Sequence, residues 1–505
     1  MSKTTSSLGL NLVRLDRRKS TPLTAQLYNS LRRAIESGML SKGFRLPSTR
    51  DFAVQLSVSR TTVVNAFEQL MAEGYLTGEV GRGTHVSDRL PEESLMARFY
   101  QTEQPAKAKE VKQARRSPTP LSTLGKSLAI IDPTKLFGSN ELKPFRASVP
   151  ALDAFPVSRW SQIVRKTWRD IDVNSLSYGD AEGYLPLRCA IANYVRGFRG
   201  VRCTEDQVMI VSGTQQAFDV ITRLVVEPGD KVLMESPGYP RAKQAFQSAG
   251  AKLVHVPVDQ QGLCVDWARE HAMDARLAYV TPSHQFPLGV TMTIERRMQL
   301  IELASQHEIW IVEDDYDSEF RYAHRPIPAL QGLDSGDRTI YVGSFSKIIY
   351  PSLGVGFAIV PPSLIDGFKK TLYLAGRPPS LVDQIVLTQF IEEGHFARHL
   401  RRMRTVHEAR RSALVSGLQK HLGDVLKIVG ADAGLHCTAI LNANWSDVIV
   451  ADEAAAQGVL LRPLSSCMGS DQQSDFCNGL VFGFACSTPI QIRDAIRKIV
   501  PLFKH

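Results

Sequence analysis

The sequence predicts an α/β protein with a small N-terminal helical domain and a larger domain built on a mostly parallel central sheet. The chain has 505 residues, of which 43% are hydrophobic, so it is too long for one ordinary domain and too apolar for a disordered chain. Beyond about residue 140, helical patterns alternate with short apolar runs. That alternation is typical of parallel sheets covered by helices.

The large domain contains six apolar runs that we interpret as strands. They are Val208–Val211, Lys231–Met234, Ala278–Val280, Trp310–Val312, Thr339–Val342 and Val355–Val360. In three other segments, apolar residues recur at helical spacing. These segments are Trp160–Asp170, Pro186–Phe198 and Gln215–Val226. After about Leu381 the pattern is rich in helix and then mixed, which predicts a smaller lobe.

Three short helices and a hairpin are predicted near the N-terminus. Apolar residues at helical spacing predict a first helix over Pro22–Ser37, and Ser48 and Ser59 are suited to cap two further helices. Glycines alternate with strand formers over Gly74–Val86, which predicts a small hairpin. Short helices followed by a hairpin indicate a winged helix-turn-helix.

The second helix of a helix-turn-helix enters the major groove of DNA with its N-terminal residues against the bases. Here that position is occupied by Ser59, Arg60, Thr61 and Thr62. Arg60 can form two hydrogen bonds with a guanine, and Thr61 and Thr62 can reach phosphates or a thymine methyl. Taken singly, such a side chain is more often an ordinary solvated residue, so the prediction depends on their order.

Other basic residues of the N-terminal domain are also expected to contact double-stranded DNA. Arg45 and Arg50 flank the first helix of the pair, where they would reach phosphates. Gly81 and Arg82 form the expected wing tip, which would enter the minor groove. Residues 1–90 carry 13 Lys and Arg against 7 Asp and Glu, while the whole chain has a formal charge of +9. This asymmetry indicates an anion-binding N-terminal domain.

Composition suggests where the domains end. We assign residues 1–88 to the DNA-binding domain, 89–140 to a linker and 141–505 to the large domain. In the middle segment the composition shifts to Lys, Glu, Gln, Ser, Thr and Pro, with few large apolar residues before Leu121, which is typical of a solvated linker.

Cysteine usage and the absence of targeting signals limit the class of protein. The seven cysteines are odd in number, widely spaced and never arranged as Cys-x-x-Cys, so we expect neither a disulfide framework nor a metal site. No segment has the pattern of a signal peptide or a membrane span. We therefore expect a cytoplasmic protein that does not bind membranes.

Side chains of the large domain match what a protein must supply to pyridoxal 5′-phosphate (PLP), which needs a lysine, a carboxylate for the pyridine nitrogen, a phosphate cradle and an aromatic plate. Lys347 follows a predicted strand, with the hydroxyls of Ser344 and Ser346 beside it for the phosphate. Asp314 also follows a predicted strand and can pair with the pyridine nitrogen, while Tyr316 can donate a hydrogen bond to the ring oxygen.

The cradle and the plate are also present. Gly213 and Thr214 lie between a predicted strand and helix, where backbone amides bind phosphate, and Tyr239 supplies the plate. Each motif alone is commoner as a helix start, a solvated loop or an N-cap. Their order on successive strand ends favours a cofactor site.

Two families resemble this chain. Over Pro22–Val86, with its RLPSTR and VSRTTV blocks, the sequence is similar to the GntR-type winged helix-turn-helix. The large domain resembles fold-type I aminotransferases in the segments YGDAEGYLPLRCAIANY, VSGTQQAFD, ESPGYPRAK, TPSHQFPLGVTM, VEDDYDSEFRY, GSFSK and EEGHFARHLRRMR. The combination resembles transcriptional regulators of the MocR, GabR and PdxR type.

The resemblance implies PLP on Lys347 as a Schiff base, with the roles given above for the other residues of the site. It also implies that the loop of His284 and Gln285 lies beside the ring and that Arg241 faces a small-molecule effector. Members of this family form head-to-tail homodimers, which we expect here on resemblance alone.

Two positions depart from the family pattern. Gly354 stands where an arginine commonly lies near the phosphate, and Val481 stands where aminotransferases place an arginine for the substrate carboxylate. The first change removes an expected counter-charge, and the second weakens the case for a standard amino-acid substrate. Arg462 and Arg377 are candidates to replace the missing clamp, although each is also explained as an ordinary surface arginine.

These features predict a transcription regulator in which PLP, alone or joined to an amine or amino acid, controls promoter binding. Genes of vitamin B6 synthesis and of amine or amino-acid metabolism are both open as targets. We expect no enzyme activity beyond a residual transaminase half-reaction. The alternatives are a working aminotransferase localised by its DNA-binding head, and a regulator that has lost PLP and keeps the large domain for dimerisation.

Overall fold

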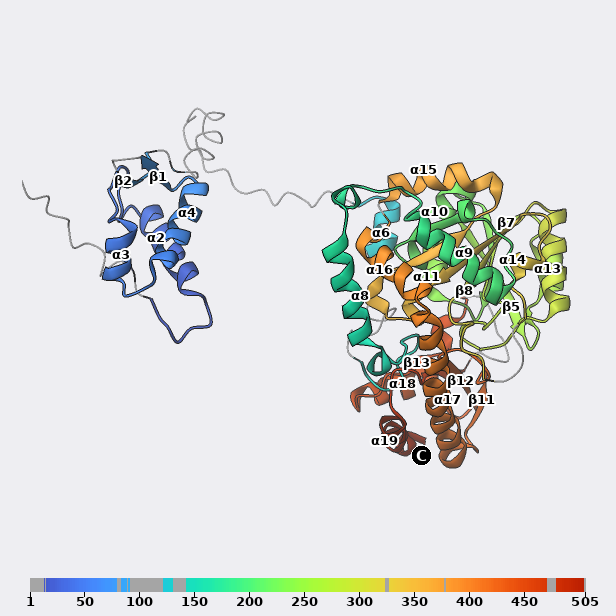
Figure 1. Ribbon diagram of the computed structural model, residues 1–505. Helices are drawn as coiled ribbons and strands as arrows, with labels where there is room; N and C mark the ends of the chain where they lie inside the picture. Colours follow the sequence, from blue (N-terminus) through green and yellow to red (C-terminus); the bar gives the residue numbers. More distant parts are fainter. Residues whose placement is uncertain are drawn as a thin grey trace, which may run out of the picture. The chain divides into compact units, whose positions relative to one another are not determined.

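The computed structural model describes residues 13, 15–79, 83–88, 90, 121–129, 142–322, 327–376, 378–469 and 478–503 (Figure 1). Contacts divide the chain into two units, Met1–Thr119 and Pro120–His505. Within the described residues, none of the helices combines the length and apolar character needed to cross a bilayer.

The first unit has the predicted three helices and hairpin. They are α2 (Leu23–Glu36), α3 (Thr49–Gln55), α4 (Arg60–Ala72), β1 (Leu76–Glu79) and β2 (Gly83–Val86). The strands pair antiparallel. Ser48 accepts a hydrogen bond from the Asp51 amide and Ser59 accepts one from the Thr62 amide, which confirms both predicted N-caps. The hairpin is the wing of a winged helix-turn-helix.

A single apolar core holds the first unit together. Leu27, Val63 and Leu70 are fully buried, and the rings of Phe52 and Phe67 lie 5.9 Å apart. These side chains come from all three helices, so the apolar faces that predicted the helices also pack them against one another.

The second unit contains thirteen α-helices within its described residues, of which α14 is a single short turn. Their bounds are α6 (Thr123–Ala129), α8 (Val157–Asp170), α9 (Leu185–Arg199), α10 (Thr214–Val225), α11 (Pro240–Ser248), α12 (Val265–His271), α13 (Ile294–Gln306), α14 (Leu330–Leu333), α15 (Ile365–Ala375), α16 (Leu381–Glu392), α17 (His395–Leu422), α18 (Asp447–Ala456) and α19 (Pro489–Ile499).

All of these helices except α6 lie in the region 141–505 that was predicted for the large domain. Helix α6 lies inside the segment 89–140 that the composition assigned to a linker, most of which is outside the described residues. The predicted helices over Trp160–Asp170, Pro186–Phe198 and Gln215–Val226 correspond to α8, α9 and α10 and are confirmed to within a few residues.

An eight-stranded sheet forms the centre of the second unit, in the order β3-β10-β9-β8-β7-β4-β5-β6. The strands are β3 (Val208–Val211), β4 (Lys231–Ser236), β5 (Lys252–Asp259), β6 (Gly262–Leu263), β7 (Ala275–Val280), β8 (Trp310–Asp315), β9 (Thr339–Ser344) and β10 (Gly356–Ile359). The neighbours from β9 to β5 all run parallel, while β10 and β6 are antiparallel to their partners. The mostly parallel sheet is thus confirmed, and all six predicted strands belong to it.

Helices cover both faces of this sheet. Along β4, Val232 and Met234 pack with α10 and α11, whereas Leu233 packs with α12 and α13 on the other face. Strands that are buried on both sides read as continuous apolar runs, which is why these strands could be recognised in the sequence.

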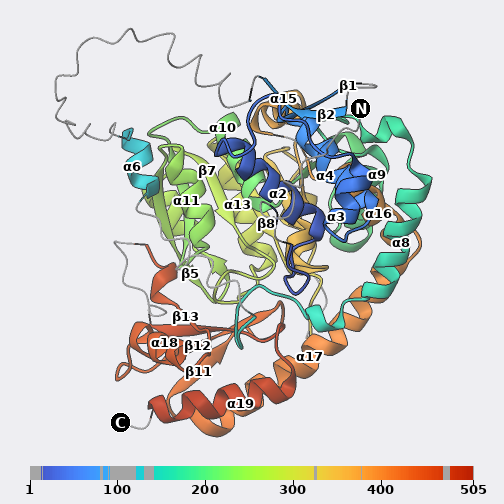
Figure 2. The same cartoon turned by 90° about the vertical axis from the view of Figure 1, so that its left-hand side faces the viewer.

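A smaller antiparallel sheet completes the second unit, in the order β11-β12-β14-β13. Its strands are β11 (Leu426–Val429), β12 (His436–Leu441), β13 (Arg462–Pro463) and β14 (Gly479–Gly483). The long helix α17 packs against α16 and α19, and one core cluster includes residues of these helices and of both sheets (Figure 2). The mixed lobe predicted after Leu381 corresponds to this region.

The parallel strands bring their carboxyl ends to one edge of the large sheet. β4 ends at Ser236, β7 at Val280, β8 at Asp315 and β9 at Ser344. Ligands of open parallel sheets bind at this edge, so the loops that follow these four strands are where a site is expected.

A buried ion pair ties α9 to the end of β8. The Nε atom of Arg199 donates to Oδ2 of Asp315 at 2.7 Å, and each side chain is only 1% exposed. Tyr341 also donates to this carboxylate, at 2.7 Å, and Arg199 donates to Ser283. Burial alone would raise the pKa of Asp315, but Arg199 and Tyr341 hold it below its usual value.

Replacing Arg199 is therefore expected to destabilise the large domain. Arg199→Met leaves the buried Asp315 charge without its main partner, and removing one member of such a pair typically costs about 3–5 kcal/mol. The control is Arg223→Met, because Arg223 forms an exposed pair with Asp219 in which the side chains are 54% and 47% exposed. Exposed pairs contribute about 0–1 kcal/mol. Urea unfolding measures the stability of both variants. Equal unfolding midpoints would show that the buried pair contributes no more to stability than the exposed pair.

Candidate functional site

A cavity lies at the carboxyl edge of the large sheet. Its lining residues come from loops that are distant in the sequence. They are Ser148, Thr214, Tyr239, Tyr279, Thr281, Phe286, Asp314, Tyr316, Ser344 and Lys347. Six of them, from Thr214 to Lys347, were predicted as cofactor residues from the sequence. The fold therefore brings the predicted lysine, carboxylate, hydroxyls and aromatic plate to one cavity.

Lys347 reaches the cavity from the end of β9. The short 3-10 helix Phe345–Lys347 directly follows this strand, so the lysine lies one turn beyond the sheet. Burial lowers the pKa of Lys347, and the nearby Asp314 partly opposes this shift. A lowered pKa increases the fraction of neutral amine, which is the form that attacks an aldehyde.

Asp314 is the buried carboxylate of the cavity and is 3% exposed. Its Oδ2 atom accepts a hydrogen bond from the Tyr279 hydroxyl at 2.6 Å. Its Oδ1 atom is buried and has no hydrogen-bond partner among the described residues. Burial raises the pKa of Asp314 to about 7, although Tyr279 and Lys347 favour the charged form. A buried carboxylate oxygen without a donor suits a ligand that brings its own N–H group, as a protonated pyridine does.

The start of α10 has features that suit a phosphate group. Gly213 has a φ of +117°, which favours glycine, and directly precedes α10, whose first amides have no partner within the helix. Thr214 and Ser344 line the cavity. The amide of Ser346 donates to the Ser344 hydroxyl at 3.2 Å, and Ser346 itself does not line the cavity.

Gly354 lies at a turn rather than in a strand. It has a φ of +61° and ends the 3-10 helix Pro351–Leu353. Among the described residues that line the cavity, Lys347 is the sole cation. The described groups that could hold a phosphate are therefore the hydroxyls of Thr214 and Ser344 and the first amides of α10.

Two aromatic rings flank the cavity. Tyr239 lies at the N-terminus of α11, and its ring centroid is 5.3 Å from that of Phe286 at an angle of 72°. Tyr239 was the predicted plate. Phe286 was not predicted, although it lies within the quoted TPSHQFPLGVTM segment.

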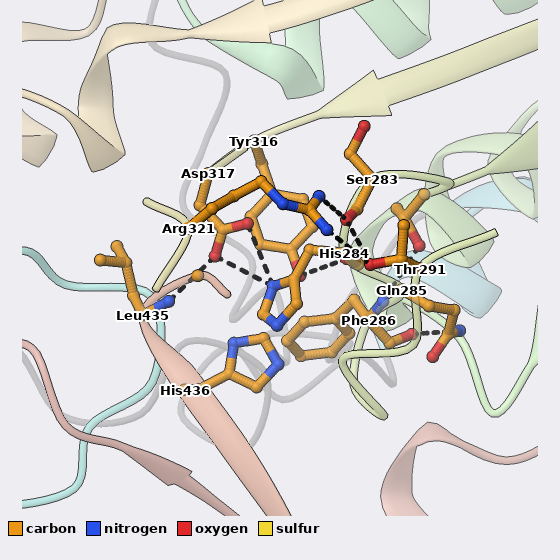
Figure 3. A network of polar contacts seen from close by, with 12 residues as sticks. Ser283, His284, Gln285, Phe286, Thr291, Tyr316, Asp317, Arg321, Leu435 and His436 are labelled. Atoms are coloured by element: carbon orange, nitrogen blue, oxygen red, sulfur yellow. Dashed lines mark hydrogen bonds and ion pairs between the residues drawn. The ribbon is translucent and has the colours of Figure 1, made fainter. Parts of the chain in front are cut away.

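Polar contacts connect the loop after β7 to the end of β8 and to β12 (Figure 3). The Nδ1 atom of His284 lies 3.1 and 3.2 Å from the two carboxylate oxygens of Asp317. Tyr316 donates to the His284 carbonyl at 2.8 Å, and Leu435 donates its amide to Asp317. His436 from β12 lies over His284, with ring centroids 4.8 Å apart. The small sheet is thus attached directly to the loop beside the cavity.

This network affects two predicted residues. His284 is buried but does not line the cavity. Tyr316 does line the cavity, and its hydroxyl, predicted to meet a ring oxygen, donates to the His284 carbonyl. His284, Asp317 and His436 also offer metal-ligand atoms within 4.8 Å of one another, but Asp317 is already hydrogen-bonded to one of the His284 nitrogens.

Three other lining residues were not predicted. Tyr279 lies in an apolar run that we had interpreted only as a core strand, and Thr281 directly follows this run, at the start of the quoted TPSHQFPLGVTM segment. Ser148 lies in the segment before α8, with a φ of +64°. None of these features distinguishes a cavity residue from a core or loop residue until the strands are assembled.

Arg241, predicted to face the effector, is the second residue of α11 and half-buried. It does not line the cavity. Burial lowers the pKa of Lys347, and the charge of Arg241 lowers it further. Burial raises the pKa of Tyr239, and Arg241 opposes that rise.

Most of the predicted DNA-contact residues in the described part of the first unit are exposed. Arg60 and Thr61 begin α4 and are exposed, and Arg50 is exposed on α3. The Thr62 hydroxyl lies 2.8 Å from that of Ser59, so these two side chains contribute to the cap. Arg45 is exposed and forms a backbone bridge with His85 of the wing.

The described part of the chain offers no ion-pair partner to Arg45, Arg50 or Arg60, which leaves these guanidinium groups able to bind phosphate or base edges. Gly81 and Arg82, the predicted wing tip, lie outside the described residues.

The two units match two different known families. Residues 153–474 match the family described as aminotransferase class I and II, and residues 23–86 match the bacterial regulatory proteins of the gntR family. The second unit is similar to the crystal structure of a kynurenine aminotransferase from Pyrococcus horikoshii, with a TM-score of 0.69 and 26% identity, covering 76% of this chain and 98% of that one.

Two relatives match almost the whole chain. The probable rhizopine catabolism regulatory protein MocR of Rhizobium meliloti is 39% identical over 97% of this chain and 95% of its own length. The HTH-type pyridoxine biosynthesis transcriptional regulator PdxR of Corynebacterium glutamicum is 30% identical over 96% of this chain and 97% of its own length. The chain therefore belongs to the MocR-type family of transcriptional regulators, which join a GntR-type helix-turn-helix to an aminotransferase class I and II domain.

Proposed function

We propose that the large domain of this regulator binds PLP on Lys347 and that occupancy of its cavity changes the affinity of the head for promoter DNA. The observation that carries this proposal is the unpartnered, buried Oδ1 atom of Asp314 in the same cavity as Lys347. A charged carboxylate without a donor is costly to bury, and a cofactor that brings an N–H group relieves that cost.

Each predicted residue has a role in this proposal. Lys347 bonds to the cofactor aldehyde, Asp314 accepts from the pyridine nitrogen, and Tyr239 and Phe286 flank the ring. The phosphate is held by Gly213, Thr214, Ser344 and Ser346. Tyr316 and His284 hold the ring-oxygen side through their shared hydrogen bonds. When bound, PLP supplies an aldehyde that reacts with primary amines.

The head binds double-stranded DNA through the start of α4. We propose that Arg60, Thr61 and Thr62 read bases and that Arg45 and Arg50 contact phosphates, with Ser59 fixing the start of the helix. Gly81 and Arg82 are proposed to form the wing tip. The domain limits proposed here are 1–88 for the head and 141–505 for the cofactor-binding domain, with the linker between them.

The effector is proposed to be PLP itself or an amine or amino acid that reacts with it, and the target genes to belong to vitamin B6, amine or amino-acid metabolism. A ligand changes DNA affinity only if it binds one arrangement of the protein better than another. A head-to-tail homodimer would present two heads to two half-sites.

We propose sensing rather than turnover as the role of the large domain. Val481 is fully buried and carries no charge where an aminotransferase holds its substrate carboxylate, so productive orientation of a substrate loses a major contact. Steady-state assays with a panel of amino donors distinguish the two roles, because sustained multiple turnover would favour the working enzyme.

Lys347→Ala tests the cofactor assignment. Wild-type protein mixed with PLP should acquire a visible absorption band and an altered affinity for a duplex selected by the protein from a random pool, and the variant should show neither change because it lacks the amine that bonds to the aldehyde. Lys231→Ala serves as the control, since Lys231 begins β4 at the opposite end of the strand from Ser236. A visible band of equal intensity in Lys347→Ala would reject Lys347 as the attachment point.

Asp314→Asn should weaken PLP binding and stabilise the cofactor-free protein. A charge-assisted hydrogen bond contributes about 1.5–3 kcal/mol, so the dissociation constant of PLP should rise by about 10- to 100-fold. Fluorescence titration with PLP measures this change, with the exposed Asp219→Asn as control.

The effect of Asp314→Asn on stability depends on pH. The pKa of Asp314 is about 7 in the folded protein, above its ordinary value, so the carboxyl resists ionisation in the fold and wild-type stability falls as pH rises toward 7. The asparagine variant has no carboxyl to ionise, so its stability does not fall in this way. Without cofactor, its gain in thermal stability over wild type should therefore be larger at pH 8 than at pH 5. An advantage that shrinks with rising pH would contradict the raised pKa.

Two head variants separate base reading from phosphate binding. Arg60→Ala should reduce the preference for the selected duplex over a scrambled one, because the proposed guanine contact discriminates by about 1–3 kcal/mol. Arg45→Ala should weaken binding to both duplexes equally. It should also reduce the salt dependence of binding by the amount expected for about one phosphate contact. Fluorescence anisotropy over a range of salt concentrations measures both, and an Arg60→Ala protein with wild-type preference would remove α4 from the recognition role.

A further inference from the structure

We propose that a groove between the start of α8 and the start of α17 binds an oxyanion that carries a proton, of which hydrogenphosphate is the simplest. Figure 2 shows both helices on the same flank of the second unit. The groove and the cofactor cavity share no lining residue. The groove is therefore a second ligand site, and its assignment does not depend on PLP binding.

One face of α17 supplies most of the basic groups of this groove. His395 and Arg398 lie in the first turn of the helix, and His399 and Arg402 lie four residues beyond them, one turn later. Side chains four residues apart are neighbours on a helix surface, and all four line the groove. Within the described part of the chain, none of the residues that line the groove is acidic.

Helix α8 supplies a third arginine and its own N-terminus. Pro156, which directly precedes the helix, and Arg159 in its first turn both line the groove. The first turn of α8 has neither a side-chain cap nor an acidic residue. The first amides of a helix have no acceptor within it and carry partial positive charge, so this end of α8 favours an anion.

The arginines of the groove gather without a matching negative charge. Arg159 and Arg402 form no hydrogen bond or ion pair with any residue that the structure describes. Arg398 donates to Nδ1 of His395 at 2.6 Å and to the Glu393 carbonyl at 3.3 Å. The Glu393 carboxylate pairs with His395 at 3.2 Å and does not line the groove. Like charges held close together repel one another, and a bound anion would relieve that repulsion.

His399 is the buried polar side chain of the groove and is 4% exposed. Its Nε2 atom lies 2.8 Å from the Ile348 carbonyl, which can only accept, so Nε2 carries the proton. Its Nδ1 atom is buried and has no partner among the described residues. Burial lowers the pKa of His399, and Arg402 lowers it further, although the hydrogen bond to Ile348 opposes the shift. The ring is therefore neutral near neutral pH, and Nδ1 is an acceptor.

This combination of donors and one buried acceptor selects among anions. The guanidinium groups and the helix amides donate to charged oxygens, whereas Nδ1 of His399 needs a hydrogen-bond donor. Inorganic phosphate keeps at least one proton near neutral pH and so offers both. Sulfate and the phosphodiesters of DNA carry no proton and would leave the buried nitrogen unsatisfied, which costs binding free energy. The groove therefore fits hydrogenphosphate better than either.

The test is isothermal titration calorimetry of the full chain with inorganic phosphate and with sulfate, at constant ionic strength. Phosphate should bind about 10-fold or more tightly than sulfate, as expected when a buried acceptor is left without a donor. The double variant Arg398→Gln/Arg402→Gln should bind phosphate about 10-fold or more weakly, because it loses two charged donors. Phosphate that enters the cofactor cavity is unaffected by this variant, so the heat that is lost belongs to the groove.

A matched control removes two charges elsewhere. Arg223→Gln/Arg497→Gln changes the net charge by the same amount, at exposed ion pairs on α10 and α19, and should bind phosphate as wild type does. His399→Phe keeps an aromatic ring beside Phe155 and Phe390 and should lose the preference for phosphate over sulfate. Its thermal unfolding midpoint shows whether the variant is folded, and the preference of the wild-type chain tests the proposal without any variant.

Three results would overturn the proposal. Equal affinity of the wild-type chain for phosphate and sulfate would remove the selecting role of His399. Wild-type phosphate affinity in Arg398→Gln/Arg402→Gln would remove the groove as the binding site. If this variant instead keeps its phosphate affinity and binds a DNA duplex more weakly, the groove is a contact for DNA. None of these results bears on the visible band expected for PLP on Lys347, so the proposed function stands or falls separately.

Discussion

The carboxylate of Asp314, held out of water at the end of β8, is the constraint on which the site depends. One of its oxygens accepts from Tyr279 and the other has no donor among the described residues, so the free protein carries an incompletely satisfied polar group at its centre. Such a group costs stability unless a ligand completes it. The parallel sheet holds Asp314 and Lys347 at the ends of neighbouring strands, where one ligand can meet both.

The small sheet completes the surroundings of this site. His436 and Thr438 on β12 contact the loop that contains Pro287, and the same loop contributes Phe286 to the cavity. Because β12, β14 and β13 are paired in fixed register, a side chain on any of them keeps its position relative to that loop.

The fold was largely predictable because its signals are local. Apolar runs marked the strands buried on both faces, and Ser48 and Ser59 marked helix starts through the hydroxyls that cap them. Strand β5 was missed because its first half is only partly buried, and its KLVHVPVD sequence lacks a continuous apolar run. Helix α6 was missed because its surroundings have the composition of a linker.

The site was predictable only where its residues follow strand ends in recognisable motifs. Lys347, Asp314 and Tyr239 were found in this way. Tyr279 and Ser148 were not, because their position at the cavity depends on how distant strands and loops assemble. Arg462 lies directly opposite Val481 because β13 pairs with β14, and the sequence alone does not show this pairing.

Thermodynamic linkage offers the most direct measurement of the central claim. The dissociation constant of PLP should be determined for the full chain in the free state and again when the protein is saturated with its selected duplex. If cavity occupancy controls the head, the two constants differ by the same factor by which PLP changes the affinity for that duplex. Identical constants in the presence and absence of DNA would show that the two domains act independently and would contradict the proposed sensor.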